Sequence, residues 1–176
     1  MNMLRRLALL FGAWVLTTSA AVAGIPAAYA PIVVMPVGTP QRYEFDLTAA
    51  LARAQREKKR LYVYLGADNC PFCRKYEAFL DRNAAELTPH FARDYLVVDL
   101  RSTLAALASR LYIRIGEVSL PYAEFQHSIG DERARALVYP SVWLLNGAAR
   151  PLMQMPAGAG TFETVTEQLE ILRLEN

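Results

Sequence analysis

The only two cysteines of the 176-residue chain, Cys70 and Cys73, are separated by Pro71 and Phe72. Two thiols at this spacing can form a short structural crosslink, supply half of a metal site, or act as a redox couple that exchanges with other thiols. Each of these uses requires different surroundings. The residues around the pair therefore help to decide among them.

A purely structural crosslink and a metal site both fit this pair poorly. In the chain-entropy model, a loop this short restricts the unfolded chain by only roughly 2 kcal/mol, against about 4.7 kcal/mol for a hundred-residue loop. Zn²⁺ would need two more ligands, and the chain has no other cysteine and only His90 and His127. Haem attachment would need a histidine directly after Cys73, where the sequence has Arg74. We therefore expect no metal and no cofactor.

The position of the pair favours redox chemistry. Residues 61–66, LYVYLG, form an aromatic and β-branched run that predicts a buried strand, and Pro71 suits the first turn of a helix that follows it. A thiol at a helix N-terminus meets unpaired backbone N–H groups and the positive end of the helix dipole, and both favour the thiolate. We assign Cys70 as the nucleophile and Cys73, one turn further along, as the thiol that resolves the mixed disulfide.

Strands and helices alternate around this site. The pattern predicts a helix over residues 47–58 capped by Asp46, a helix over residues 84–94 and a strand over residues 95–100. Such alternation indicates an α/β sheet with parallel neighbours. The region of residues 101–130 is interpreted as an insertion, with a helix near residues 104–111, an irregular segment through Pro121 and a helical turn over residues 122–128.

The C-terminal part closes the predicted sheet. Asn146 and Gly147 stand between two apolar runs, which predicts a tight hairpin turn and an antiparallel pair of strands. A last helix is expected over residues 161–174. Its predicted core-facing residues are Phe162, Val165, Leu169 and Leu172.

The N-terminal residues 1–23 have the layout of a secretory signal peptide. Two arginines precede an apolar run over residues 7–16, and small residues lead to Ala23. The apolar run is shorter than the ~20 residues that span a membrane, so we expect cleavage after Ala23 and export, for example to a periplasm. An uncleaved membrane anchor is the alternative. Residues 24–45 are rich in proline and predict an extended arm or edge strand before a domain of residues 46–176.

Charge and compartment narrow the possible partners. Cleavage removes Arg5 and Arg6 from the 19 Lys and Arg, which leaves 17 against 17 Asp and Glu. A near-neutral domain offers no basic surface for nucleic acid. Exported chains meet oxidising conditions in which disulfides form readily.

The order of these features resembles the thioredoxin-like superfamily. The resemblance rests on LYVYLGADNCPFC at residues 61–73, the helix that the cysteines open, a second strand, and VYPSVWLLNG at residues 138–147. It implies a thioredoxin-like fold, with a central mixed sheet flanked by helices and an insertion between the second strand and the hairpin. It also implies that the bond between Tyr139 and Pro140 is cis and lies against the disulfide. The backbone of Tyr139 would pair with an extended partner segment.

The sequence departs from the family pattern at two positions near the cysteines. Thioredoxins proper have a buried aspartate six residues before the first cysteine, where this chain has Tyr64. The strongest periplasmic oxidants have a histidine between the cysteines, where this chain has Phe72. An intermediate reduction potential is therefore expected. The Pro-Phe pair is similar to glutaredoxin motifs, but glutathione is not carried over.

Together these features predict an exported thiol:disulfide oxidoreductase that exchanges disulfides with protein thiols and an unidentified redox partner. No nucleic acid is expected to bind, and membrane contact is expected only if the signal segment is kept. The alternative is a binding or carrier module of the same fold that uses the cysteines as sensor or as copper ligands, with His127 as a further ligand. The predicted catalytic residues are Cys70 and Cys73, and the predicted substrate-binding residues are Pro71, Phe72, Tyr139 and Pro140.

Overall fold

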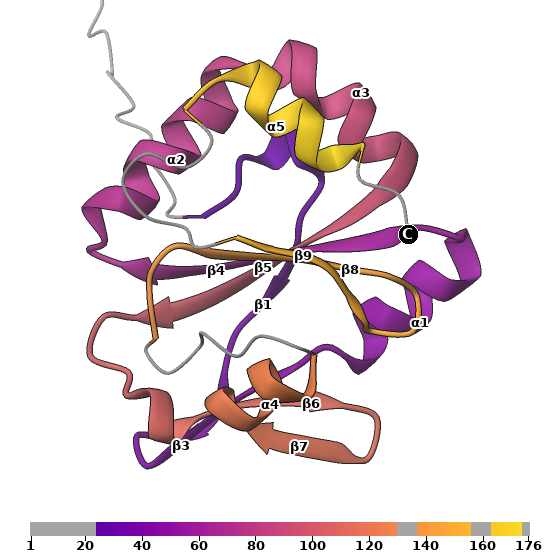
Figure 1. Ribbon diagram of the computed structural model, residues 1–176. Helices are drawn as coiled ribbons and strands as arrows, with labels where there is room; N and C mark the ends of the chain where they lie inside the picture. The colour runs from indigo at the N-terminus through magenta and orange to yellow at the C-terminus, as the bar shows by residue number, and fades with distance from the viewer. Residues whose placement is uncertain (1–23, 130–136, 156–162, 174–176) are drawn as a thin grey trace, which may run out of the picture.

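The structure, a computed structural model, describes residues 24–129, 137–155 and 163–173. It is an α/β protein with two mixed β-sheets and several helices (Figure 1). Within the described residues, the larger sheet has five strands in the order β1-β5-β4-β8-β9. These strands are β1 (Ile32–Val34), β5 (Tyr95–Thr103), β4 (Arg60–Asp68), β8 (Ser141–Leu145) and β9 (Pro151–Met155).

Strand β4 lies at the centre of this sheet. It runs parallel to β5 and antiparallel to β8, while β1 is parallel to β5 and β9 is antiparallel to β8. The register with β5 is continuous, from Arg60 opposite Tyr95 to Asp68 opposite Thr103. The carboxyl ends of β4 and β5 therefore lie side by side, immediately before the cysteine pair.

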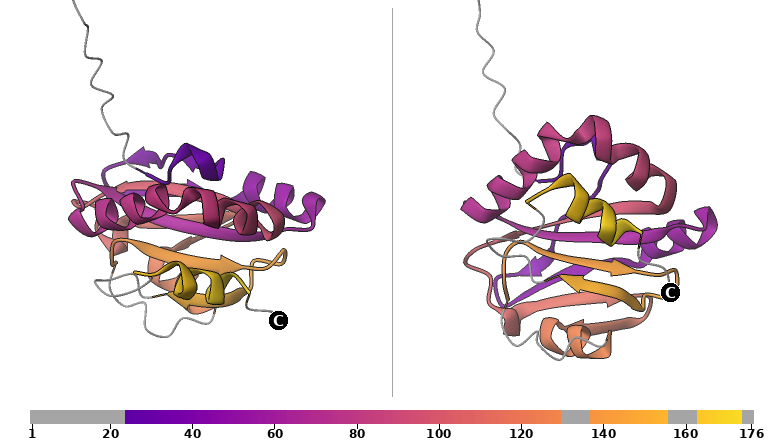
Figure 2. Two further views of the ribbon diagram at one scale, coloured as in Figure 1. Left: turned by 90° about the horizontal axis from the view of Figure 1, so that it is seen from above. Right: turned by 45° about the horizontal axis from the view of Figure 1, so that its top comes forward.

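Alternation along β4 gives the sheet two apolar faces, because successive side chains of a strand point to opposite sides. Tyr62 and Tyr64 belong to a core under α2 (Pro71–Arg82), α3 (Ala84–Asp94) and α5 (Val165–Leu172), which cover one face (Figure 2). The opposite core contains Leu61, Val63 and Leu65 and includes residues of α1 (Thr48–Glu57) and α4 (Tyr122–Ser128).

A second sheet packs against that opposite core. Its order is β2-β3-β6-β7, formed by β2 (Val37–Thr39), β3 (Arg42–Asp46), β6 (Leu111–Ile115) and β7 (Val118–Pro121). Its residues Phe45, Leu111 and Ile113 are buried in that core. Two segments distant in sequence thus build one sheet, since β3 pairs in parallel with β6.

Most local predictions are confirmed. The helices expected near residues 47–58, 71–80 and 84–94 correspond to α1, α2 and α3, and the strand expected over residues 95–100 corresponds to β5. Asp46 accepts a hydrogen bond from the Thr48 N–H at 2.8 Å, at the start of α1. The helical turn expected over residues 122–128 is α4.

The prediction for the region of residues 101–121 is wrong. In place of the helix near residues 104–111 there is a single 3-10 turn, η2 (Ala108–Arg110), followed by β6. The segment expected to be irregular is the β6–β7 hairpin. The physical reason is a remote partner: β6 pairs with β3, in the segment predicted to be an arm, and no local pattern shows that pairing.

The antiparallel pair β8–β9 is confirmed, but its turn is not the predicted tight turn. The loop spans residues 146–150, and Ala149 adopts the left-handed conformation with φ 59°. The Asn146 side-chain oxygen accepts the N–H groups of Ala148 and Arg150 at 2.9 and 3.0 Å. Asn146 therefore stabilises a longer loop.

The last helix begins later than predicted. Thr164 and Glu167 form a reciprocal capping box that starts α5 at Val165. Leu172 is buried and Leu169 is partly buried, as expected, while the prediction for Phe162 lies outside the described residues.

Of the two predictions for the N-terminal region, only one falls within the residues that the structure describes. The predicted signal peptide also lies outside the described residues. Residues 24–45 contribute the short turn η1 (Ala27–Tyr29), β1, β2 and most of β3. In the part of the chain that the structure describes, no helix has the length and apolar character needed to cross a membrane.

Candidate redox site

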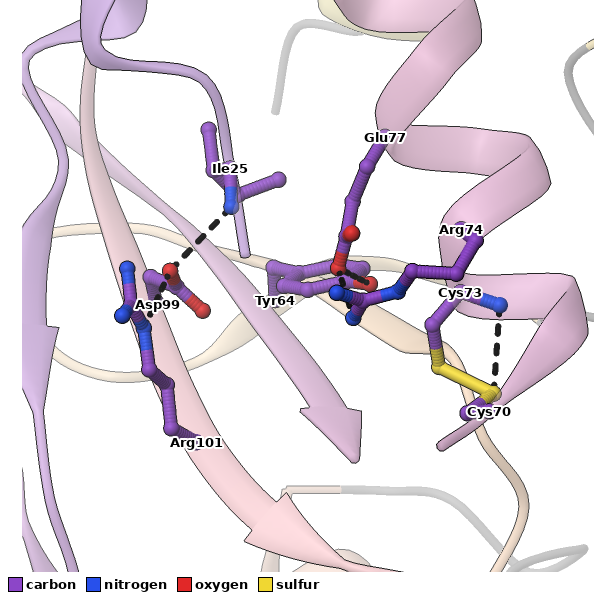
Figure 3. A network of polar contacts seen from close by, with 8 residues as sticks. All are labelled: Ile25, Tyr64, Cys70, Cys73, Arg74, Glu77, Asp99 and Arg101. Carbon is purple, nitrogen blue, oxygen red and sulfur yellow. Dashed lines mark hydrogen bonds and ion pairs between the residues drawn. A yellow bond between two sulfur atoms is a disulfide. The ribbon is translucent and has the colours of Figure 1, made fainter. Parts of the chain in front are cut away.

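Cys70 and Cys73 form a disulfide at the N-terminus of α2 (Figure 3). Cys70 is the N-cap residue, and its Sγ accepts a hydrogen bond from the Cys73 N–H at 3.1 Å. Pro71 occupies the first turn, where its missing N–H costs nothing. The sulfur of Cys70 thus lies at the positive end of the helix dipole, where a thiolate is stabilised.

The two sulfur-bearing residues are almost fully buried. Cys70 is 2% exposed and Cys73 is 0% exposed, and they form a small buried cluster with Ala67, against which Tyr139 packs. Phe72 between them is 52% exposed. Phe72 is therefore the exposed side chain of this segment, and of the two cysteines only Cys70 has any exposed surface.

The segment before β8 lies against this pair. The peptide bond between Tyr139 and Pro140 is cis, as the resemblance implies. The Tyr139 hydroxyl hydrogen-bonds with Ser102 Oγ at 2.8 Å, which ties this segment to the end of β5. Among the sequence-predicted site residues, the structure thus places Tyr139 against the cluster of Ala67 and the two cysteines.

A buried carboxylate behind the disulfide was not predicted from the sequence. Glu77 is 7% exposed, and its Oε1 accepts hydrogen bonds from the Tyr64 hydroxyl at 2.8 Å and from the Arg74 guanidinium at 2.7 Å (Figure 3). Burial raises the pKa of Glu77, while the bonds from Tyr64 and Arg74 oppose that rise. Tyr64 on the central strand β4 thus hydrogen-bonds an acid that comes from helix α2.

A second buried carboxylate belongs to Asp99 on β5. Its Oδ2 accepts the Ile25 N–H and the Arg101 Nε, each at 3.1 Å (Figure 3). Its Oδ1 has no hydrogen-bond partner among the described residues, although the side chain is fully buried. Burial also raises the pKa of Asp99.

These acids line a small pocket that we call the carboxylate pocket. Its volume is about 180 Å³, which includes the solvent at its open side. Its lining residues are Gly24, Tyr64, Gly66, Ala67, Asp68, Arg74, Glu77, Asp99, Arg101 and Ser102. Ala67 belongs both to this lining and to the cluster around the sulfurs, so the pocket lies directly behind the disulfide.

Glu77 lies on the same helix as Cys73. The two residues are four apart on α2 and therefore share one face of the helix. A carboxylate whose pKa is raised by burial is a better proton acceptor than an ordinary one. Two sequence signals point to the pocket: the spacing of four from Cys73 to Glu77, and Asp99 as the one charged residue within YLVVDL.

The copper-ligand alternative names His127 as a further ligand beside the cysteines. His127 is exposed on α4, which packs against β6 and β7 on the other side of the larger sheet. Across the described ranges, no three His, Cys, Asp or Glu side chains gather closely enough to hold a metal ion.

Comparisons with known proteins show distant similarity to solved structures. No protein-family model matches the chain, and no curated protein sequence matches it. Among solved structures, a thioredoxin-fold protein from Helicobacter pylori is similar, with a TM-score of 0.39 and 13% sequence identity. The match covers 60% of this chain and 64% of that protein, less than two thirds of its length. The chain is thus an α/β protein with a CxxC disulfide and a distant likeness to a thioredoxin fold.

Proposed function

We propose that this protein is an exported thiol:disulfide oxidoreductase of thioredoxin-like fold, cleaved after Ala23. One observation carries the proposal. A disulfide between Cys70 and Cys73 caps the helix that follows the central strand, and Tyr139, which precedes a cis-proline, packs on it.

The topology supports the thioredoxin-like assignment. The strand β4, the helix α2 and the parallel strand β5 form one unit, and the antiparallel pair β8–β9 completes the sheet beyond β4. Helices α2 and α1 pack on opposite faces of that sheet. The cysteines lie at the carboxyl end of β4, where α/β folds commonly place their sites.

The proposed reaction is a two-step exchange. With the protein reduced, the Cys70 thiolate attacks one sulfur of a partner disulfide and releases the first partner thiol. Cys73 then gives its proton to Glu77 and attacks Cys70 Sγ, which releases the second partner thiol and forms the Cys70–Cys73 disulfide. Two electrons pass to the partner. The reverse sequence oxidises a partner dithiol and reduces the protein.

The surface around the disulfide suits a protein partner. Phe72, Leu104, Leu107 and Val138 are large apolar side chains that are each about half exposed. Leu104 and Leu107 follow the end of β5, and Val138 directly precedes Tyr139. Partly desolvated apolar contacts of this kind hold a polypeptide while its backbone pairs with an extended segment.

The test compares the purified mature protein with its Cys70→Ser and Cys73→Ala variants in thiol-coupled reduction of a protein disulfide. Cys70→Ser is expected to abolish turnover. Cys73→Ala is expected to accumulate a mixed disulfide that reducing agents release, because the resolving thiol is missing. Equal turnover by Cys70→Ser and the parent would overturn the proposal.

A further inference from the structure

Gly24 lies in the carboxylate pocket. Its N–H donates a hydrogen bond to the Glu77 carboxylate, and the next N–H, of Ile25, donates to Asp99 Oδ2 at 3.1 Å. A Cβ added to Gly24 would come within 2.3 Å of Asp99 Oδ2 and 2.8 Å of an Arg101 guanidinium nitrogen. The backbone there also has φ +129°, which side chains disfavour. Glycine is therefore the residue that fits between these charges.

The anions of the pocket are not fully compensated by its cations. Arg74 contacts Glu77, and Arg101 contacts Asp99, but the two arginine side chains remain 39% and 24% exposed. Asp99 Oδ1 is buried without a partner among the described residues. Burial raises the pKa of both carboxylates in spite of these arginines. The partly uncompensated carboxylates of the pocket therefore favour the binding of a further positive charge.

We propose that the carboxylate pocket is the binding site for the α-ammonium group of Gly24, which signal cleavage creates. A signal peptidase would add water across the Ala23–Gly24 amide, so that Ala23 leaves with a carboxylate and the Gly24 nitrogen becomes an ammonium. The inference rests on the export and cleavage that are part of the proposed function.

The change from amide to ammonium matches what the pocket lacks. An amide offers one N–H, whereas an ammonium offers three donors and a full charge. The ammonium can keep the bond to Glu77 and supply a donor to Asp99 Oδ1. Charge-assisted hydrogen bonds are roughly twice as strong as neutral ones. In the uncleaved chain the same nitrogen is neutral, so cleavage completes the charge balance behind the disulfide.

The first measurement is the pKa of the Gly24 α-amino group, by NMR of protein labelled at Gly24 and released from a fusion so that it begins there. We expect a pKa at least one unit above the ordinary value of roughly 8, because Glu77 and Asp99 favour the charged form. The other charged groups that line the pocket are Arg74, Arg101 and Asp68. An ordinary α-amino pKa would overturn the proposal.

The second measurement compares the thermal stability of protein with a free Gly24 amine and protein with an Nα-acetylated Gly24. The free amine is expected to give the higher Tm at pH 7. Because its folded-state pKa is raised, this stabilisation is complete below about pH 8 and disappears as the pH rises through the raised pKa. Equal Tm values across pH 6–10 would count against the proposal.

The Glu77→Gln substitution tests whether the stabilisation comes from the pairing of Glu77 with the ammonium group or from Glu77 alone. We expect this variant to lower the Tm of the free-amine protein, since an ion pair is lost. In the acetylated protein it should leave Tm unchanged or raise it, because a buried and partly uncompensated anion is removed. Glu86→Gln, an exposed change on α3, is the matched control and should alter neither. The same change in Tm on Glu77→Gln in both proteins would refute the pairing of Glu77 with the Gly24 ammonium.

The cleavage itself is checked by the intact mass and N-terminal sequence of protein exported by cells that express the full chain. A mature chain that begins at Gly24 supports the proposal, and one that begins elsewhere overturns it. None of these measurements depends on thiol exchange. Their failure is therefore distinguishable from failure of the proposed oxidoreductase activity.

Discussion

The Tyr64 hydroxyl donates a hydrogen bond to Glu77 Oε1 at 2.8 Å, behind the Cys70–Cys73 disulfide. Tyr64 stands on the central strand, and Glu77 stands on the helix that carries the cysteines. The acid of this site thus comes from the helix, and the strand residue orients it.

The first prediction concerns Glu77 as proton acceptor. In Nα-acetylated protein, whose Gly24 nitrogen is an amide as in the structure, Glu77→Gln is expected to slow resolution of the mixed disulfide at neutral pH by about 10²-fold. The parent rate should rise with pH through the Glu77 pKa, which burial raises above its ordinary value. The variant rate should rise only where the thiol itself ionises, at roughly pH 8.5. Stopped-flow kinetics from pH 5 to 9 measures both profiles, and identical profiles would exclude this role for Glu77.

The second prediction concerns partner contact at Phe72. Phe72→Ala removes a half-exposed aromatic ring beside Cys70 and leaves the core intact, so the free energy of unfolding should change by less than about 0.5 kcal/mol. The KM for a protein disulfide should rise about tenfold, as expected for loss of an aromatic contact worth roughly 1–2 kcal/mol. The rate with a small disulfide such as oxidised dithiothreitol should be nearly unchanged. A similar loss with both substrates would place the effect in the chemistry and not in partner binding.

The third prediction concerns the second sheet. Glu44 on β3 is bonded to Ser119 on β7 and to Arg114 on β6, the latter at 2.7 Å, and the Ser119 bond contributes most to lowering the pKa of Glu44. Its stabilisation is therefore present above the unfolded-state pKa and lost as the pH falls through the lower folded-state pKa. Glu44→Gln should cost about 1–2 kcal/mol at pH 7. Chemical denaturation from pH 2 to 7 should show the parent and the variant converging at acid pH, and a constant difference would refute this assignment.

The fourth prediction concerns the β8–β9 loop. Asn146→Ala removes the side-chain oxygen that accepts two backbone N–H groups, so we expect a loss of about 1–2 kcal/mol in unfolding free energy. Asn146→Asp keeps an acceptor and is expected to recover most of that loss. Urea denaturation of the three proteins measures the difference, and equal stability of all three would show that the loop backbone needs no such support.

The site was predictable where its signals are local. The strand β4, the start of α2 at Pro71 and the N-cap position of Cys70 all follow from residues next to one another in the sequence. The carboxylate pocket was missed because it depends on register. Only the pairing of β4 with β5 places Asp99 opposite Tyr64. Only the path of the N-terminal segment brings Gly24 into the same pocket as these two residues.

The wrong helix near residues 104–111 has a similar cause. Leu104, Leu107 and Leu111 have helical spacing, but the first two are about half exposed and the third starts a strand. Leu111 lies opposite Tyr43, a residue from the N-terminal segment. The spacing of apolar residues along the sequence cannot reveal a strand whose partner is so remote.

The N-terminal segment pairs with late neighbours in both sheets, since β1 lies beside β5 and β3 beside β6. If the chain is exported N-terminus first, as we propose, β1 and β3 lack these late partners until residues as far as Ile115 have crossed the membrane. Long-range pairing of this kind makes assembly slow. On the proposed export route, the thiols of Cys70 and Cys73 would therefore reach an oxidising compartment before both sheets are complete.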